Sequence, residues 1–179
     1  MSSRDPHLMA ARIVQDAGGE LVGRTRLQKV TYLAQLAGFG DEFDFEYRHY
    51  GPFSEDLARG MQIAALIGPI AEEERQADLG ARYSIYRLRR QRPPANPDRA
   101  KFLQQAKALD AVQLELAATA AYLFAVEGIG RTKPGNPWQE TRKLKPDKAA
   151  DGRLERAAAA YASLRQVPTP RPLPQLMPP

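Results

Sequence analysis

The chain has 179 residues, of which 26 are basic and 21 acidic, and its formal net charge is +5 at pH 7. Because domains most often run to about 100–150 residues, we expect one domain over residues 1–166, followed by a flexible proline-rich tail over residues 167–179. Cysteine is absent, which excludes disulfides and thiol chemistry.

Two further absences narrow the class of protein. His7 and His49 are the only histidines, so we expect neither a His-based metal site nor a cofactor. The first residues lack the apolar core of a signal peptide, and no run approaches the roughly 20 apolar residues of a membrane helix. A cytoplasmic protein without membrane contact is therefore expected.

Charge is distributed unevenly along the chain. Residues 41–78 carry ten acidic side chains against three basic ones, whereas residues 82–107 carry eight basic side chains against one acidic. Such asymmetry bears on partners rather than on fold. It is typical of a solvated mixed surface or of a basic patch that meets an acidic protein or nucleic acid.

The first half of the chain predicts three helices. Residues 8–17 form the first, which the glycines at 18 and 19 end. Thr25 is placed to cap a second helix that reaches residue 37, with an apolar stripe wide enough to be covered on more than one side. Ser54 is placed to cap the third, which ends at Gly68 and Pro69.

Aromatic residues crowd the segment before the third helix, in the stretch "FEYRHYGPFSEDLARGM" over residues 45–61. A catalytic pocket, a nucleic-acid surface and a structural anchor are all compatible with such a stretch. Packing of the extended arm onto the domain is the interpretation that we favour. An aromatic surface that faces a partner or ligand is the alternative.

Alternating residues on either side of "ADLGA" predict a β-hairpin near residues 70–89. Three helices and a hairpin give a mainly α (α+β) multi-helix domain in which the hairpin resembles the wing of a winged helix. The helix in the recognition position begins with Glu55 and Asp56, however, and carboxylates repel phosphate, which disfavours major-groove readout. Nucleic acid would more readily meet the basic end of the hairpin, at Arg87, Arg89, Arg90 and Arg92.

Helices also dominate the prediction for the second half. Asp98 is placed to cap one helix, and Asp110 with Gln113 resembles the capping box of a buried, alanine-rich helix. An irregular loop around Trp138 precedes a last helix over residues 147–165. The tail holds six prolines in its last twelve residues, and we expect it to be extended and mobile, or a polyproline ligand.

Patterns of known enzyme sites are not found. The paired carboxylates lie in polar contexts without a base or nucleophile, and neither a dinucleotide fingerprint nor a phosphate loop is present. His49 lies beside aromatic residues and a cation, but pairing with nearby backbone explains it more simply than catalysis does. A protein without enzymatic activity is expected.

Four segments together resemble one family. "GRTRLQKVTYLAQLAG", "FEYRHYGPFSEDLARGM", "LELAATAAYL" and "WQETRKLKPDKAADGRLERAAAAYASL" look like the ordered motifs of the YwgA-like proteins, over roughly residues 10–165. That uncharacterised bacterial and phage-associated family is similar to the SocA-like, Panacea-type antitoxin domain. The resemblance implies a mostly helical domain with a winged-helix-like hairpin and no known catalysis. Panacea-type members bind and neutralise toxins, and the SocA prototype delivers its toxin to a protease.

The resemblance and the residues together give two hypotheses. In the first, the chain is an antitoxin-like interaction module that neutralises or delivers a protein partner such as a toxin. Aromatic side chains anchor interfaces, so the expected partner-binding residues are Tyr47, His49, Tyr50, Phe53 and Trp138. In the alternative, the chain is a winged-helix nucleic-acid-binding regulator that uses the arginines of the hairpin end.

Overall fold

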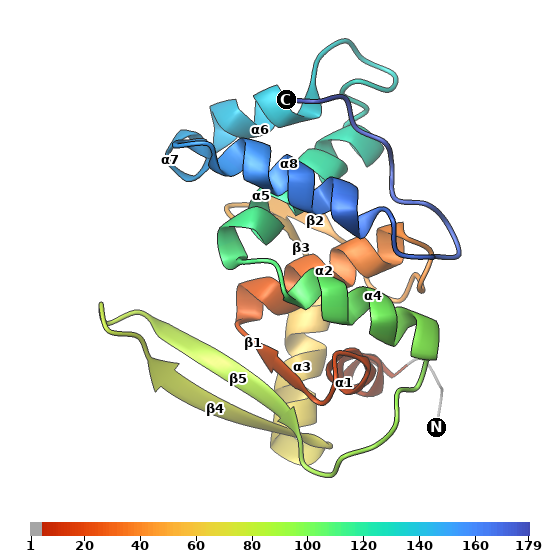
Figure 1. Ribbon diagram of the computed structural model, residues 1–179. Coiled ribbons are helices and arrows are strands. Elements are labelled where there is room, and N and C mark those ends of the chain that lie inside the picture. Colours follow the sequence, from red (N-terminus) through yellow and green to blue (C-terminus); the bar gives the residue numbers. More distant parts are fainter. Residues whose placement is uncertain (1–4) are drawn as a thin grey trace.

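The computed structural model describes residues 5–179, within which the chain forms eight helices and five strands (Figure 1). The strands are β1 (Glu20–Val22), β2 (Glu46–Arg48), β3 (Gly51–Phe53), β4 (Ile70–Gln76) and β5 (Arg82–Leu88). The helices are α1 (Pro6–Asp16), α2 (Arg24–Leu36), α3 (Glu55–Ile67), α4 (Pro97–Lys107), α5 (Ala111–Ala125), α6 (Pro137–Leu144), α7 (Pro146–Ala149) and α8 (Arg153–Leu164). The expected α+β multi-helix architecture is confirmed.

The strands form two separate antiparallel sheets. In the larger, β5 lies between β1 and β4, and the long β4–β5 hairpin extends away from the helices (Figure 1). The predicted hairpin is therefore confirmed. Strand β1 was not predicted, because three residues are too few to show an alternating pattern. Strands β2 and β3 form the second, two-stranded sheet just before α3.

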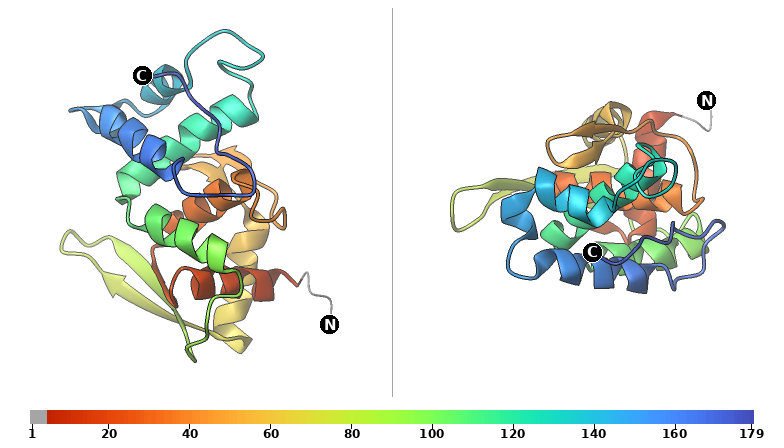
Figure 2. Two further views of the ribbon diagram at one scale, coloured as in Figure 1. Left: turned by 45° about the vertical axis from the view of Figure 1, so that its right-hand side comes forward. Right: turned by 90° about the horizontal axis from the view of Figure 1, so that it is seen from above.

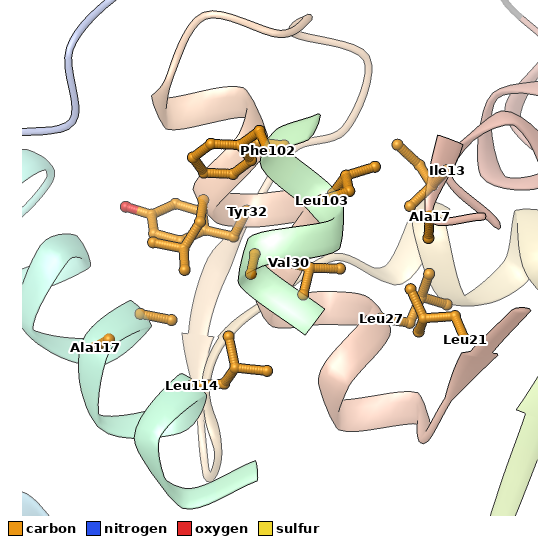
Figure 3. Close-up of a cluster of buried hydrophobic side chains, with 14 of the residues drawn as sticks. Ile13, Ala17, Leu21, Leu27, Val30, Tyr32, Phe102, Leu103, Leu114 and Ala117 are labelled. Atoms are coloured by element: carbon orange, nitrogen blue, oxygen red, sulfur yellow. The ribbon is translucent and has the colours of Figure 1, made fainter. Parts of the chain in front are cut away.

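The hydrophobic core lies around α2 and α5. Figure 3 shows side chains from α1, β1, α2, α4 and α5 converging, among them Leu27, Val30, Phe102 and Leu114. Helix α2 is buried over the eight consecutive residues from Leu27 to Ala34, so the prediction of a helix covered on more than one side is confirmed. Four alanines in the middle of α5 are fully buried, as expected for a central helix that its neighbours approach closely: Ala117, Ala118, Ala120 and Ala121.

The predicted helix starts were partly right. The Ser54 hydroxyl accepts a hydrogen bond from the Leu57 amide, and Asp110 and Gln113 form the predicted capping box. Two caps were wrong. Helix α2 begins at Arg24, so Thr25 lies inside its first turn and does not cap it. Helix α4 is capped by Asn96, whose side chain accepts from the amides of residues 98 and 99, rather than by Asp98.

The region after α5 also differs from the expectation. Part of the predicted loop around Trp138 forms helix α6, because Asn136 caps that helix and Pro137 fits its first position. The predicted last helix is divided into α7 and α8. Asp151 and Gly152 interrupt it with positive φ angles of 56° and 74°, and a right-handed helix cannot continue through that conformation.

The tail is extended, as its prolines predict, but it is not detached from the body. It leaves the end of α8, passes the end of α2 and reaches the start of α6 (Figure 1, Figure 2). The Arg171 amide donates to the Ala37 carbonyl, and the Tyr161 hydroxyl donates to the Pro174 carbonyl at 2.7 Å. Leu173 is only 2% exposed. A wholly free tail was expected because a sequence pattern does not reveal which surface a proline-rich segment contacts.

Within residues 5–179, no single helix combines the length and the apolar composition of a membrane span. Helices α4 and α5 reach that length and composition only when they are taken together, and a bend of 116° separates their axes.

Candidate functional site

The small β2–β3 hairpin organises the aromatic stretch. Its register pairs Glu46 with Phe53 and Arg48 with Gly51, so residues 49 and 50 form the turn. Gly51 has a φ of +90°, and a Cβ there would lie only 2.6 Å from the Thr119 hydroxyl on α5. Both the backbone conformation and the close approach to α5 therefore require glycine at this position.

The first aromatics of the stretch anchor the hairpin to the helices. The Phe45 ring lies 5.2 Å from that of Tyr32, and the Tyr47 ring lies 5.9 Å from that of Tyr122, measured between centroids. These edge-on and tilted contacts are typical of stabilising aromatic pairs. The structural-anchor interpretation is confirmed for Phe45 and Tyr47, although Tyr47 remains 36% exposed.

The later aromatics border a cleft instead. Tyr50 and Phe53 line a hollow of about 510 Å³ between α2, α3, the β2–β3 hairpin and the sheet, which we call the α2–α3 cleft. Tyr50 is 59% exposed. Phe53 is half-buried, and the Arg48 guanidinium lies 4.7 Å from the centre of its ring.

The cleft has an apolar floor and a charged rim. Leu27, Met61 and Tyr86 are buried at its base. On the rim, Arg24 pairs with Glu72 and Glu74 at 3.1 Å each, while Arg48 pairs with Glu46 and Glu55. Exposed ion pairs of this kind add little stability, so these arginines and carboxylates can exchange their ion-pair partners at little cost in free energy.

Two polar side chains of α2 reach the base of the cleft. The Gln28 amide exchanges two hydrogen bonds with the backbone of Ser54, at 2.9 and 2.8 Å, and thereby fixes the start of α3. The Lys29 ammonium donates to the Pro52 carbonyl at 2.7 Å. Burial lowers the pKa of Lys29 to about 8; Glu115 opposes this shift, and Lys145 and Lys148 add to it.

Glu115 on α5 gathers those two lysines beneath the hairpin turn. Lys145 donates to Glu115 at 2.7 Å and to the His49 carbonyl at 2.9 Å. Lys148 also pairs with Glu115, and its ammonium lies 4.9 Å from the centre of the Tyr50 ring. The turn that presents Tyr50 is therefore held by α5 and by the α6–α7 junction.

Sequence reasoning had not singled out Gln28, Lys29 or Glu115 as functional. Gln28 and Lys29 did stand within an otherwise apolar helix, in the segment "LQKV". That interruption is a signal, since polar side chains on a buried helix need partners. Glu115 could not be found in this way, because its lysine partners lie 30 and 33 residues away.

The predicted partner-binding residues do not all lie on one exposed surface. His49 is exposed at the hairpin turn and contributes its carbonyl to Lys145. Trp138 is only 2% exposed, and its ring packs against Tyr161 with 6.0 Å between centroids. The prediction that Trp138 faces a partner is wrong, because it belongs to the packing between α6 and α8.

The four arginines of the hairpin end do not form one free basic surface either. Arg87 pairs with Glu20 and Glu73 at 2.6 Å each. Arg89 donates to the carbonyls of Ala65 and Gly68 at the end of α3. Arg90 and Arg92 are exposed. Within residues 5–179, no group of three or more potential His, Asp or Glu ligands is arranged to hold a metal ion.

The fold and the site define an α+β multi-helix domain with a half-open, aromatic-edged cleft at the start of its third helix. No family model matches the chain. The chain is similar to the uncharacterized protein YwgA of Bacillus subtilis (strain 168), with 30% identity over 81 residues. The match covers 44% of this chain and 48% of YwgA, so it spans about half the length of that curated relative.

Proposed function

We propose that this chain is a non-enzymatic, antitoxin-like interaction module that receives a segment of a protein partner in the α2–α3 cleft. The observation that carries the proposal is the position of Tyr50 and Phe53 at the edge of a hollow of about 510 Å³ with a buried apolar floor. Apolar floors edged by aromatic and charged side chains are typical of the anchoring pockets of interfaces.

The resemblance to YwgA-like proteins supports the same proposal. The residues that carry it most specifically, the "LQK" of α2 and the "YGPFS" that leads into α3, supply Lys29, Tyr50 and Phe53 to the cleft. In Panacea-type relatives the partner is a toxin, and the bound partner here would be neutralised or delivered in the same way. A partner that arrests growth when expressed alone, but not together with this chain, would meet that description.

The test begins with affinity capture from the native host at the native expression level, after nuclease treatment. We expect a stoichiometric protein partner, and we expect the double variant Tyr50→Ala, Phe53→Ala to bind it at least about tenfold more weakly, as loss of interface anchors does. The melting temperature should stay nearly unchanged, because Tyr50 is exposed and Phe53 only half-buried.

Leu79→Ala is the matched control, since Leu79 is an exposed apolar residue at the tip of the β4–β5 hairpin, away from the cleft. It should leave capture unchanged. Equal loss of the partner in both variants, or full retention in the double variant, would rule out the cleft as the binding site. A large drop in melting temperature would assign the two aromatics to the core.

A winged-helix nucleic-acid-binding regulator is the second candidate. What supports it is the order α1–β1–α2–α3–β4–β5, into which the β2–β3 hairpin is inserted between α2 and α3, with β5 in the middle of the larger sheet. Winged-helix domains share this order apart from the inserted hairpin, and Arg90 and Arg92 are exposed. It predicts binding to duplex DNA or RNA that weakens steeply with salt and in the variant Arg90→Gln, Arg92→Gln. Absence of any gel shift at low salt would exclude this candidate.

A further inference from the structure

Lys29 is a buried cation whose charge the protein only partly compensates. Its side chain is 1% exposed, yet no carboxylate of residues 5–179 lies within ion-pair distance of its ammonium. Glu115, the acidic residue that affects it most, is already paired with Lys145 and Lys148. Charged side chains are rarely this buried unless they are paired.

The hydrogen-bonding capacity of Lys29 is also incompletely used. An ammonium has three donors, and in the part of the chain that the structure describes the Pro52 carbonyl is its one protein acceptor. Lys29 and Tyr50 are both among the residues that line the α2–α3 cleft. A residue with an uncompensated charge therefore contributes to the wall of the hollow in which the proposed function seats a partner.

A second observation concerns the sign of the charge next to Lys29. Glu115 pairs with both Lys145 and Lys148, and all three affect Lys29, so the group of three lysines and one carboxylate has a positive excess. The arginines of the rim, by contrast, are matched by carboxylates of this chain. Complementarity at an interface places the opposite charge on the partner at such a point.

We propose that the α2–α3 cleft recognises a carboxylate side chain, Asp or Glu, of the partner segment, which pairs with Lys29 while a neighbouring apolar side chain occupies the floor. The proposal deepens the proposed function and rests on it, since it names the chemistry of the segment that the cleft receives. Charge-assisted hydrogen bonds of this kind are the strong ones in interfaces, and the apolar surroundings strengthen them further.

The probe is a pair of peptides, acetyl-Ser-Phe-Glu-Ser-amide and acetyl-Ser-Phe-Gln-Ser-amide, which differ by one charge at nearly constant shape. Their dissociation constants are measured by NMR from the amide signals of the full-length protein at neutral pH. We expect the Glu peptide to bind about tenfold more tightly than the Gln peptide, with shifts concentrated in α2 and the start of α3.

Lys29→Met removes the ammonium at similar volume and should abolish the difference between the two peptides. Lys101→Met is the matched control, because it removes an exposed ammonium on α4 that does not line the cleft. It should preserve most of the difference. Equal binding of the peptides by the native protein, including no binding of either, overturns the proposal, as does a preference for the Glu peptide that survives in Lys29→Met.

The pH dependence gives a second readout. Affinity for the Glu peptide should fall as the pH rises through the range in which Lys29 loses its proton, while affinity for the Gln peptide stays constant. The charged groups that act on Lys29 are Glu115 on α5, Lys145 at the α6–α7 junction and Lys148 on α7. The other charged residues that line the cleft are Arg24, Arg48, Glu55 and Glu72. A pH profile identical for Lys29→Met and the native protein overturns the assignment to Lys29.

The two proposals fail in different ways. If the captured partner still depends on Tyr50 and Phe53 but the peptides show no preference for Glu, the interaction module stands and the carboxylate recognition falls. If capture does not depend on the cleft while the Glu preference is present and requires Lys29, the cleft binds carboxylates and the proposed partner site is elsewhere.

Discussion

Lys29 shows how one side chain can oppose the stability of the fold that surrounds it. Its ammonium is held at the base of the α2–α3 cleft by a single carbonyl, and burial lowers its pKa from an ordinary 10.5 to about 8. Such a shift means that the folded protein disfavours the charged form relative to the unfolded chain. Residues that weaken a fold in this way cluster at functional sites.

This shift predicts how stability depends on pH. Below about pH 8 Lys29 is protonated in both states, and the folded state bears the full cost of burying its charge. Between the folded and unfolded pKa values the unfolded chain binds more protons, so stability rises with pH. We expect the Lys29 contribution to the free energy of unfolding to rise by about 2 kcal/mol from about pH 7 to about pH 9.5.

The measurement is urea denaturation of the native protein and of Lys29→Met across that range. The difference between the two curves isolates Lys29, because other groups titrate alike in both proteins. Burial raises the pKa of Tyr32 and of Tyr161, so neither tyrosine should ionise in this range. A difference that does not change with pH would mean that Lys29 titrates normally.

At the scale of elements, a buried ion pair connects the end of α1 to the start of α4. Arg99 donates to Asp16 at 2.7 Å, and Asp16 is 0% exposed. The other Asp16 oxygen accepts from the amides of Ala95 and Asn96, just before α4 begins. The segment that returns from the hairpin to the helices is therefore positioned by one carboxylate.

Removal of that carboxylate should be costly. Asp16→Ala leaves Arg99 charged and buried without a partner, and we expect a loss of about 3–5 kcal/mol in the free energy of unfolding. The double variant Asp16→Ala, Arg99→Met should recover part of the loss, since the stranded charge is gone. Chemical denaturation measures both.

Glu74→Gln provides the comparison, because Glu74 pairs with Arg24 on the surface and should contribute no more than about 1 kcal/mol. Similar losses for Asp16→Ala and Glu74→Gln would show that burial adds nothing to the first pair. A double variant no more stable than Asp16→Ala would argue that the bonds to Ala95 and Asn96, rather than the ion pair, carry the effect.

At the scale of the whole molecule, the tail connects elements that are distant in sequence. Arg171 donates to backbone carbonyls at the end of α2, and Leu173 is buried beside α8, where the Arg165 guanidinium donates to its carbonyl. Figure 2 shows the tail crossing the helical face of the molecule on its way to α6. Its contacts close the core on that side.

Deletion of residues 167–179 should therefore destabilise the protein, and Leu173→Ala alone should lower the free energy of unfolding by about 2 kcal/mol or more. Met177→Ala is the control, since Met177 is largely exposed and should change stability by no more than about 0.5 kcal/mol. Thermal and chemical denaturation test both variants. An unchanged melting temperature after deletion would mean that the tail is free in solution, as its composition alone predicts.

Local patterns were sufficient for much of the fold. Ser54 and the pair Asp110 and Gln113 were correctly assigned as caps, because capping depends on residues three positions apart. The β4–β5 hairpin followed from alternation on both sides of a turn. Strand β1 did not follow, since its three residues pair with β5, which is distant in sequence. The break at Asp151 and Gly152 is a local feature that the prediction of one continuous last helix missed.

The candidate site was predictable only in part, for the same reason. Tyr50 and Phe53 stood out by composition, and the cleft does contain both. Trp138 stood out equally and is buried, because α8 covers it. Whether an aromatic side chain faces a partner or a core depends on which element packs over it, and for Trp138 that element is a separate helix further along the chain.

What the sequence by itself determined is most of the helices, the long hairpin and the aromatic stretch before α3, because hydrophobic period, caps and turns are properties of adjacent residues. Only the tertiary structure decided that Lys29 is buried at the base of a cleft and that Glu115 gathers two distant lysines beneath Tyr50. Burial and charge compensation depend on the three-dimensional neighbours of a residue, and the chain brings those neighbours together only when it folds.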